Sequence, residues 1–568
     1  MTVDSFTLAV IHSSLISIAR DMKIMTMRTA YTQLWKEQGD LSCCLMNADG
    51  EIIAQDPNGF PIHVTTMPLQ LQGAVEFIGR KNLNPGDVIA TNDPFIGGTH
   101  LPDVLIARPL FHDGELYAFA CNRGHWADIG GMGPGSYSPA TSDIHQEGIL
   151  IPPVKLFEQD IPNSGVFEMI MSNIRNRSVG LGDLRSQYAS CETAERRCSE
   201  LIKKYGLSVL NATMDEIIVR AEQMTRAQIK KFQDGEYFAR DCLDGDGQSA
   251  DRIWVDVKVT IDGSNIIADL TKSSDQSSGG MNCSYSAASS AVQYAIKAIT
   301  DPENPPNAGS YKPINVITRP GTLVDAKFPA SIVGFGEVCY RVFDVTMAAI
   351  STAIGDKAIA SGSGSTGTVV IAGPRHRSSG DSYFTTLELS SGAYGARANS
   401  DGINAIRYGP GNAGHIPIEA DEIENPIFFE KYEIVPDTGG AGRFRGGNGF
   451  VRNFRIEADS AQICICADRH ETPPPGLFGG YAGSTAHYLL ESGNKKKRHQ
   501  VLPSKTPYID LKKNTLVSLQ SAGGGGFGNP IQRDHAMIAE DLRDGYITKT
   551  AAVEVYKYPY VSDDEDKK

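Results

Sequence analysis

The chain has 568 residues, of which 41% are hydrophobic and 21% are charged, and its formal net charge at pH 7 is -14. This composition is typical of a soluble globular protein, and the length exceeds what one hydrophobic core usually serves. The negative charge argues against nucleic acid or an anionic membrane as a partner.

Residues 1–160 are predicted to form an N-terminal α/β region. It begins with an amphipathic helix, because apolar residues recur at spacings of three and four through about Thr29. A hairpin over residues 41–54 and a helix over residues 67–80 are expected next. Short apolar runs bounded by glycine-rich loops then predict strands at residues 88–90, 104–107 and 116–120.

Three further regions are expected. Residues 161–240 are predicted to be helical, as a long antiparallel pair broken near Tyr205-Gly206. Residues 241–530 are predicted to be strand-rich with glycine-rich turns, although a helix is expected over residues 287–299. Their clearest hairpin spans residues 252–270. Residues 531–568 should combine a helix over residues 533–556 with a disordered acidic tail. The fold class is therefore a mixed α+β arrangement of several subdomains.

The cellular location is suggested by absences in the sequence. No uninterrupted apolar run is long enough to span a membrane, and the N-terminus lacks the basic and apolar regions of a secretory signal. Of the ten cysteines, Cys43 and Cys44 are adjacent, Cys464 and Cys466 are one residue apart and the rest are scattered, which does not resemble a disulfide framework. We therefore expect a cytoplasmic protein with reduced thiols and no membrane partner.

Two glycine-rich segments at predicted strand ends carry the strongest signal of a functional site. His100 and Asp103 are three residues apart in the first, and His125 lies in the second. Two imidazoles and a carboxylate can converge on one divalent metal and leave a position free for water or substrate, which is typical of catalytic sites. Asp40 and Asp128 could join the ligands or orient an imidazole. This mixture of nitrogen and oxygen donors suits Zn, Mn or Fe and does not distinguish among these metals.

No segment is equipped to bind ATP. The glycine run at residues 523–528 lacks the Lys and Ser/Thr that a phosphate loop places after its glycines, and residues 362–367 also lack the Lys. A tight irregular turn is expected at residues 523–528.

A set of long motifs is shared with a known family. They span residues 92–103, 124–131, 436–447, 468–469 with 475–480, 523–530 and 544–546. In these motifs the sequence resembles the hydantoinase B/oxoprolinase B family, from about residue 4 to residue 556. That family includes N-methylhydantoinase B subunits, the caprolactamase beta subunit and the metal-bearing subunits of acetone and acetophenone carboxylases.

The resemblance implies a division of labour. A hydantoinase A-like partner subunit, which holds ATP and Mg, would phosphorylate the substrate carbonyl, and this subunit would receive the activated species. His100, Asp103 and His125 match the family's metal ligands, and Asp40 matches an acidic position at the same site. We take Asp40 and His125 as the candidate catalytic residues. The implied activity is ATP-dependent opening of a hydantoin, oxoproline or lactam-like ring by metal-bound water, within a hetero-oligomer.

Two departures from the hydantoinase pattern leave the small-molecule substrate open. They are residues 412–419, where His415 could reach the substrate pocket or be structural, and residues 124–126, where many members have two consecutive histidines. Two alternatives to hydrolysis also remain: a subunit of an ATP-dependent acetone- or acetophenone-type carboxylase, and a non-catalytic scaffold that only docks the kinase-like partner.

Overall fold

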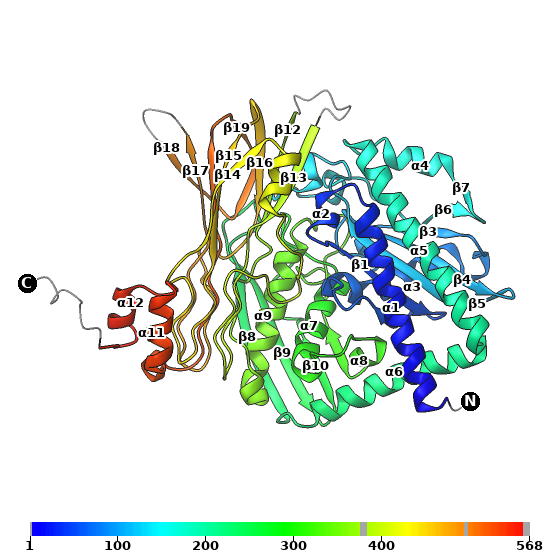
Figure 1. The fold of residues 1–568 in the computed structure, drawn as a ribbon, viewed down its shortest axis with the longest axis horizontal. Helices are drawn as coiled ribbons and strands as arrows, with labels where there is room; N and C mark the ends of the chain where they lie inside the picture. The colour runs from blue at the N-terminus through cyan, green and yellow to red at the C-terminus, as the bar shows by residue number, and fades with distance from the viewer. Residues whose placement is uncertain (1–2, 375–382, 493–497, 560–568) are drawn as a thin grey trace, which may run out of the picture.

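The N-terminal part of the protein is built on a seven-stranded antiparallel sheet. The computed structural model describes residues 3–374, 383–492 and 498–559, so the predicted acidic tail lies outside the described residues (Figure 1). The strands of this sheet are β1 Leu41–Asn47, β2 Ile52–Gln55, β3 Val88–Thr91, β4 Asp103–His112, β5 Glu115–His125, β6 Val154–Glu158 and β7 Ile161–Pro162. Their order is β2-β1-β5-β4-β3-β6-β7. The predicted first hairpin and the three short strands are confirmed.

Helices cover both faces of this sheet. Alternate side chains of a strand point to opposite faces, so Cys43 and Leu45 pack in the core shared with α1, whereas Cys44 and Met46 pack against α3. On the first face α1 lies beside α5 (Figure 1). The helices of this part of the chain are α1 Ser5–Thr29, α2 Gln33–Lys36, α3 Pro61–Ile78, α4 Ser164–Met171, α5 Arg177–Tyr205 and α6 Leu207–Ile229.

Two of these helices differ from expectation. The helix α3 begins at Pro61 rather than at residue 67, because the fixed φ of proline suits the first position of a helix. The break between α5 and α6 falls at Gly206 as predicted, but the predicted antiparallel packing of the two helices is wrong. Gly206 has φ 85°, and from there α6 runs across the end of the molecule (Figure 1). Thus α5 packs along α1, and α6 packs mainly against α8, which spans Ala308–Tyr311.

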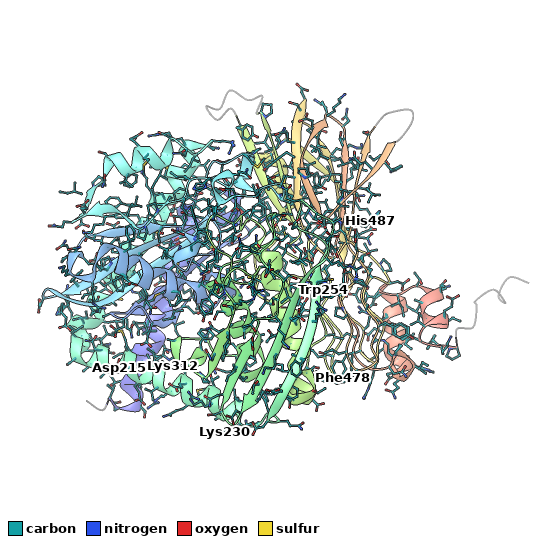
Figure 2. The ribbon with its side chains drawn as sticks, turned by 180° about the vertical axis from the view of Figure 1, so that it is seen from behind. Asp215, Lys230, Trp254, Lys312, Phe478 and His487 are labelled. Carbon is teal, nitrogen blue, oxygen red and sulfur yellow. The ribbon has the colours of Figure 1, made fainter. Side chains whose placement is uncertain are left out.

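A second sheet of four strands follows. Its strands are β8 Gly235–Leu243, β9 Ile253–Asp262, β10 Asn265–Asp269 and β11 Ile314–Ile317, in the order β11-β10-β9-β8. The predicted hairpin is confirmed in β9 and β10. Alternate residues of β9, such as Val255 and Val257, are buried beneath α9. Trp254 lies on the other face, seen in Figure 2, where the Arg240 guanidinium sits 4.2 Å from the centroid of its ring.

Two helices pack behind this sheet and next to each other. The helix α7, Tyr285–Thr300, confirms the predicted one, but α9, Phe335–Ile354, lies where only strands and turns were expected. Residues 335–357 form the one helical stretch in the described chain with the length and apolar composition of a membrane span, yet 78% of that window is buried inside the fold. Burial of this kind is what a core helix of a soluble protein shows.

The C-terminal half contains two further sheets packed face to face. The first has the order β13-β12-β16-β19 and the second the order β14-β15-β20-β17-β18. Side chains such as Val369 and Ile463 from the first sheet share a core with Phe454 and Val517 from the second. The strands are β12 Thr368–Pro374, β13 Tyr383–Leu389, β14 Ile427–Ile434, β15 Phe450–Ile456, β16 Ser460–Cys466, β17 His487–Ser492, β18 Arg498–Leu502, β19 Lys505–Lys512 and β20 Leu516–Gln520.

Extended glycine-rich segments connect this sandwich to the C-terminal helices. They pack backbone against backbone: a Cβ added to Gly446 would lie 2.0 Å from the carbonyl oxygen of Gly524. The run at residues 523–528 is therefore an extended packing element and not the tight turn that was expected. The last predicted helix is in fact two, because Gly545, at φ 74°, lies in the turn between them. The remaining helices are α10 Ile418–Glu424, α11 His535–Arg543 and α12 Lys549–Glu554.

Candidate metal centre

The predicted site residues meet at one end of the N-terminal sheet. Asp103 is the first residue of β4 and His125 the last of β5, and the two are directly opposed in the antiparallel ladder. His100 lies in the loop just before β4. Asp40 immediately precedes β1, and its carbonyl oxygen accepts a hydrogen bond from the His125 amide at 3.2 Å. Neighbouring strands thus bring together residues that are far apart in the sequence.

Three side chains form a compact, buried set of donors. Nε2 of His100 lies 3.1 Å from Nδ1 of His125 and 3.2 Å from Oδ1 of Asp103. Nδ1 of His125 and Oδ1 of Asp103 are 3.3 Å apart. When two donor atoms bind the same ion at about 2.0–2.1 Å with a tetrahedral angle between them, the distance from one donor atom to the other is about 3.3 Å. The described arrangement therefore fits a divalent cation of the size of Zn, Mn or Fe.

A further histidine stands beside these donors. His63, in the first turn of α3, places Nε2 3.2 Å from Oδ2 of Asp103 and 3.8 Å from Oδ1 of Asp40. Sequence reasoning missed it because the helix was expected to start at residue 67. Pro61, two residues earlier, marks the true helix start and was the available signal.

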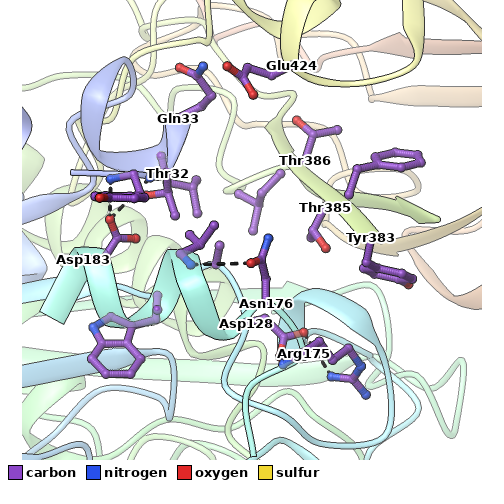
Figure 3. Close-up of a pocket in the computed structure, with 18 of the residues that line it drawn as sticks. Thr32, Gln33, Asp128, Arg175, Asn176, Asp183, Tyr383, Thr385, Thr386 and Glu424 are labelled. Atoms are coloured by element: carbon purple, nitrogen blue, oxygen red, sulfur yellow. Dashed lines mark hydrogen bonds and ion pairs between the residues drawn. The ribbon is translucent and has the colours of Figure 1, made fainter. Parts of the chain in front are cut away.

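The other acidic candidates occupy different positions. Asp40 lines the same cavity as the donors but lies outside the trio whose donor atoms are all within 4.8 Å of one another. Asp128 does not orient an imidazole. Its carboxylate accepts hydrogen bonds from the Gly135 amide and from Nη1 of Arg175, both at 3.0 Å. It faces a separate cavity of about 250 Å³, where Figure 3 shows it paired with Arg175.

His415 is not among the residues that line the cavity of the donors. Its Nδ1 lies 2.8 Å from the Tyr432 hydroxyl, and its ring packs against Phe450. Burial, together with the charges of Arg452 and Arg407, lowers the pKa of His415 to about 3. His415 is therefore neutral near pH 7, and its contacts are those of a packing residue.

Neighbouring groups hold the donors in place. The indole nitrogen of Trp35 donates to the carbonyl oxygen of His125 at 2.8 Å, and the Thr99 hydroxyl donates to Oδ2 of Asp103. Nη1 of the fully buried Arg123 donates to the carbonyl oxygen of His63 at 3.0 Å. Such supporting hydrogen bonds fix the orientation of ligating side chains.

Burial and mutual charge set the protonation of the trio. Burial lowers the pKa of His100, although Asp103 opposes this effect. Burial also acts to lower the pKa of His125, but the hydrogen bond to Asp103 and the charges of Asp40 and Asp103 produce a net rise. Burial alone would raise the pKa of Asp103, whereas the adjacent His63 and His100 hold it well below its usual value. The carboxylate is thus ionised and ready to bind a cation.

The donors open into a cavity of about 50 Å³. Since one water needs roughly 10–15 Å³ by the same kind of measure, this space admits a few small groups. The 250 Å³ cavity of Figure 3 is larger, but it contains no comparable cluster of donors in the described chain. Residues from the C-terminal half also line the smaller cavity and include Phe335, Gly336, Tyr340, Thr366, Thr368 and Arg407.

Comparison with known proteins identifies relatives over nearly the whole chain. The Hydantoinase B/oxoprolinase family model matches residues 4–530. The caprolactamase subunit beta of Pseudomonas jessenii is 30% identical over 96% of this chain and 94% of that one. The 5-oxoprolinase of Dictyostelium discoideum is 30% identical over 95% of this chain, which matches 41% of that longer protein.

Two solved structures share the fold. The crystal structure of the ATP-dependent caprolactamase from Pseudomonas jessenii superposes with a TM-score of 0.92 at 27% identity, covering 99% of this chain and 98% of that one. The nucleotide-free acetone carboxylase superposes with a TM-score of 0.89 at 19% identity, covering 97% of this chain and 79% of that one. The second likeness concerns the fold alone.

Proposed function

Because this chain belongs to the hydantoinase B/oxoprolinase family, we propose that it is the metal-bearing catalytic subunit of an ATP-dependent hydrolase that opens a cyclic amide. The ring would be hydantoin, oxoproline or a lactam. The observation that carries this proposal is the buried trio of His100, Asp103 and His125 at the wall of a cavity. Closed structural metal sites have no such adjoining space.

The chain's own residues have separate roles in this proposal. A divalent ion at the trio would supply a Lewis acid and lower the pKa of a nearby water. His100, Asp103 and His125 hold that ion, and Trp35 keeps His125 in place through its carbonyl oxygen. Asp40 lines the cavity next to the trio, with His63 beside its carboxylate, which suits it to complete the ligand set or to accept the proton of the attacking water.

A partner subunit would supply the ATP chemistry. An amide carbonyl is a poor electrophile because nitrogen donates electrons into it, and phosphorylation of the oxygen removes that resonance. The sequence offers no phosphate loop for this step. The related caprolactamase chain is named as one subunit of its enzyme, and the 5-oxoprolinase is more than twice as long as the part matched here. We therefore propose a hetero-oligomer with an ATP-binding, hydantoinase A-like subunit.

We also propose that the protein works in the cytoplasm. All ten cysteines are buried and unpaired, as expected for a reducing compartment.

Reconstitution of the complex tests the activity. The chain is purified with its kinase-like partner and supplied with ATP, Mg and a panel of hydantoin, 5-oxoproline and caprolactam. We expect ADP and the ring-opened product to form together, and no product without ATP. Failure of every cyclic amide to react in a complex that hydrolyses ATP would contradict ring opening.

An ATP-dependent carboxylase, the alternative that the family motifs left open, is the second candidate, and the acetone carboxylase has the same fold. Labelled bicarbonate separates the two chemistries, since only a carboxylase incorporates the label into its product.

A scaffold role predicts that variants lacking His100 or His125 remain as active as the wild type.

A further inference from the structure

The N-terminus of the buried helix α9 points at the metal cavity. Phe335 and Gly336, its first two residues, line the cavity, and the Phe335 ring lies 4.5 Å from the ring of His100, centroid to centroid. No side chain caps this end of the helix, and the Gly336 amide donates to no carbonyl in the described chain. The first turn of a long helix carries partial positive charge and free N–H groups, and both favour an anion.

A buried guanidinium faces the same space. Arg407 is only 6% exposed and lines the cavity, and its Nε and Nη1 atoms have no hydrogen-bond partner among the described residues. The cavity's carboxylates, Asp40 and Asp103, pair with His63 rather than with Arg407. The Arg407 guanidinium lies 6.0 Å from the centroid of the Phe60 ring, but an aromatic ring is no counter-ion, and an arginine removed from water without a counter-ion is unfavourable. An anion bound in the cavity would compensate its charge.

A third donor lies beside Arg407. Tyr340 lies four residues after Gly336 and therefore on the same face of α9, and its buried hydroxyl has no hydrogen-bond partner among the described residues other than the adjacent Arg407. Burial raises the pKa of Tyr340, while the adjacent Arg407 opposes that rise. The hydroxyl therefore keeps its proton at neutral pH and can donate it to an oxyanion.

Gly336 packs closely against a neighbouring residue of the cavity. A Cβ at this position would lie 2.7 Å from Cγ2 of Thr366, which also lines the cavity. The metal donors, the helix end and Arg407 all line the same small cavity.

We propose that Arg407, the Tyr340 hydroxyl and the Gly336 amide form a phosphate-binding site in the same cavity as the metal donors. The site takes a tetrahedral phosphate group, either on the activated substrate or as free inorganic phosphate. This inference rests on the proposed function for its choice of anion, since a carbonyl phosphorylated by the partner arrives with such a group. Arg407 then touches the phosphate oxygens and places the substrate carbonyl next to His100, Asp103 and His125.

Binding of inorganic phosphate to the full-length, metal-loaded chain tests the site by calorimetry. Arg407→Gln should raise the Kd for phosphate at least about tenfold, since hydrogen bonds to charged groups contribute about 1.5–3 kcal/mol. Tyr340→Phe removes a single hydroxyl and keeps the ring, so a rise of about threefold to tenfold is expected. The matched control is Arg443→Gln, which removes the same charge at an exposed position outside the cavity and should leave the Kd unchanged.

Metal content, measured on the same samples, separates failure of the site from failure of the proposed function. If metal binds and the ring opens, but both Arg407→Gln and Tyr340→Phe bind phosphate as tightly as the wild type, the anion site is wrong and the hydrolase stands. If the wild type binds no metal, yet phosphate binding still depends on Arg407, the proposed function is wrong and the anion site stands.

The complex with the partner subunit distinguishes the two sources of phosphate. If the group belongs to the activated substrate, Arg407→Gln should lower kcat/KM for the ATP-dependent reaction at least tenfold, and Arg407→Lys should restore part of the loss. Unchanged kcat/KM in Arg407→Gln would overturn a role for this site in holding the substrate. If Arg407→Gln does not fold, Tyr340→Phe becomes the deciding variant. Normal phosphate binding and normal kcat/KM in Tyr340→Phe would then overturn the proposal.

Discussion

Asp103 and His125 face each other across the ladder between β4 and β5, and their donor atoms lie 3.3 Å apart. These residues are 22 positions apart in the sequence, and the hairpin register alone makes them neighbours. A rigid sheet therefore carries part of the proposed metal centre, whereas His100 is supplied by the preceding loop. Sites placed on strands are held more precisely than sites on loops.

The donor trio makes a direct prediction about metal content. His100→Ala and His125→Ala should each lose stoichiometric metal and ATP-dependent turnover, because two donors hold a divalent ion far less tightly than three. Mass spectrometry of the purified protein measures the metal. His145→Ala is the matched control, since this imidazole is exposed and should change neither quantity. Full metal occupancy in both His100→Ala and His125→Ala would contradict the assignment of these residues as metal ligands.

Asp40 and Asp103 should respond differently to loss of charge. Asp103→Asn should abolish metal binding, because its carboxylate contacts both imidazoles. Asp40→Asn should keep most of the metal but reduce kcat by about 10²-fold or more, as expected for loss of a general base. Metal analysis alongside steady-state kinetics separates the two. Equal loss of metal in both variants would instead make Asp40 a principal ligand.

The packing of Trp35 against β5 predicts a sensitive position next to His125. A Cβ at Gly124 would lie 2.3 Å from Cζ2 of Trp35, so Gly124→Ala should displace the indole that donates to His125. We expect a loss of about 1–3 kcal/mol in the free energy of unfolding, together with weaker metal binding. Chemical denaturation measures the first effect. Gly165→Ala, where the added methyl meets only an ordinary contact at 3.7 Å, should stay within about 1 kcal/mol of the wild type.

Glu147 should make stability depend on pH. Its buried carboxylate accepts hydrogen bonds from the amides of Ile332 and Val333, just before α9. Burial raises the pKa of Glu147 from 4.5 to about 7. The folded state therefore keeps a proton that the unfolded state has released, and the stabilisation present below pH 4.5 is lost as the pH rises through about 7.

The size of this effect follows from the shift. At about 1.4 kcal/mol per pKa unit, the loss approaches about 3 kcal/mol. Glu147→Gln keeps an acceptor for the two amides but cannot ionise, so its free energy of unfolding should fall less than that of the wild type between pH 5 and pH 8. Parallel profiles for the two proteins would show that Glu147 does not titrate in this range.

Local sequence patterns predicted some elements and missed others for identifiable reasons. The helix α1 and the hairpin of β9 and β10 carry regular apolar spacing, and both are present. The helix α9 was missed because its charged residues point inward: Nη2 of Arg341 lies 2.5 Å from Oδ2 of Asp468, which is 127 positions away. A charged residue on the buried face of a helix interrupts the periodic pattern of apolar residues from which a helix is predicted.

The sequence by itself selected the three donors that the structure brings together. Two imidazoles and a carboxylate in glycine-rich segments, without a phosphate loop, were sufficient to select His100, Asp103 and His125, because donor type and spacing are local properties. Only the tertiary structure brought His63 to Asp103 and placed Arg407 in the wall of the same cavity. Those neighbours depend on strand register and on packing between distant parts of the chain, and no local pattern encodes either.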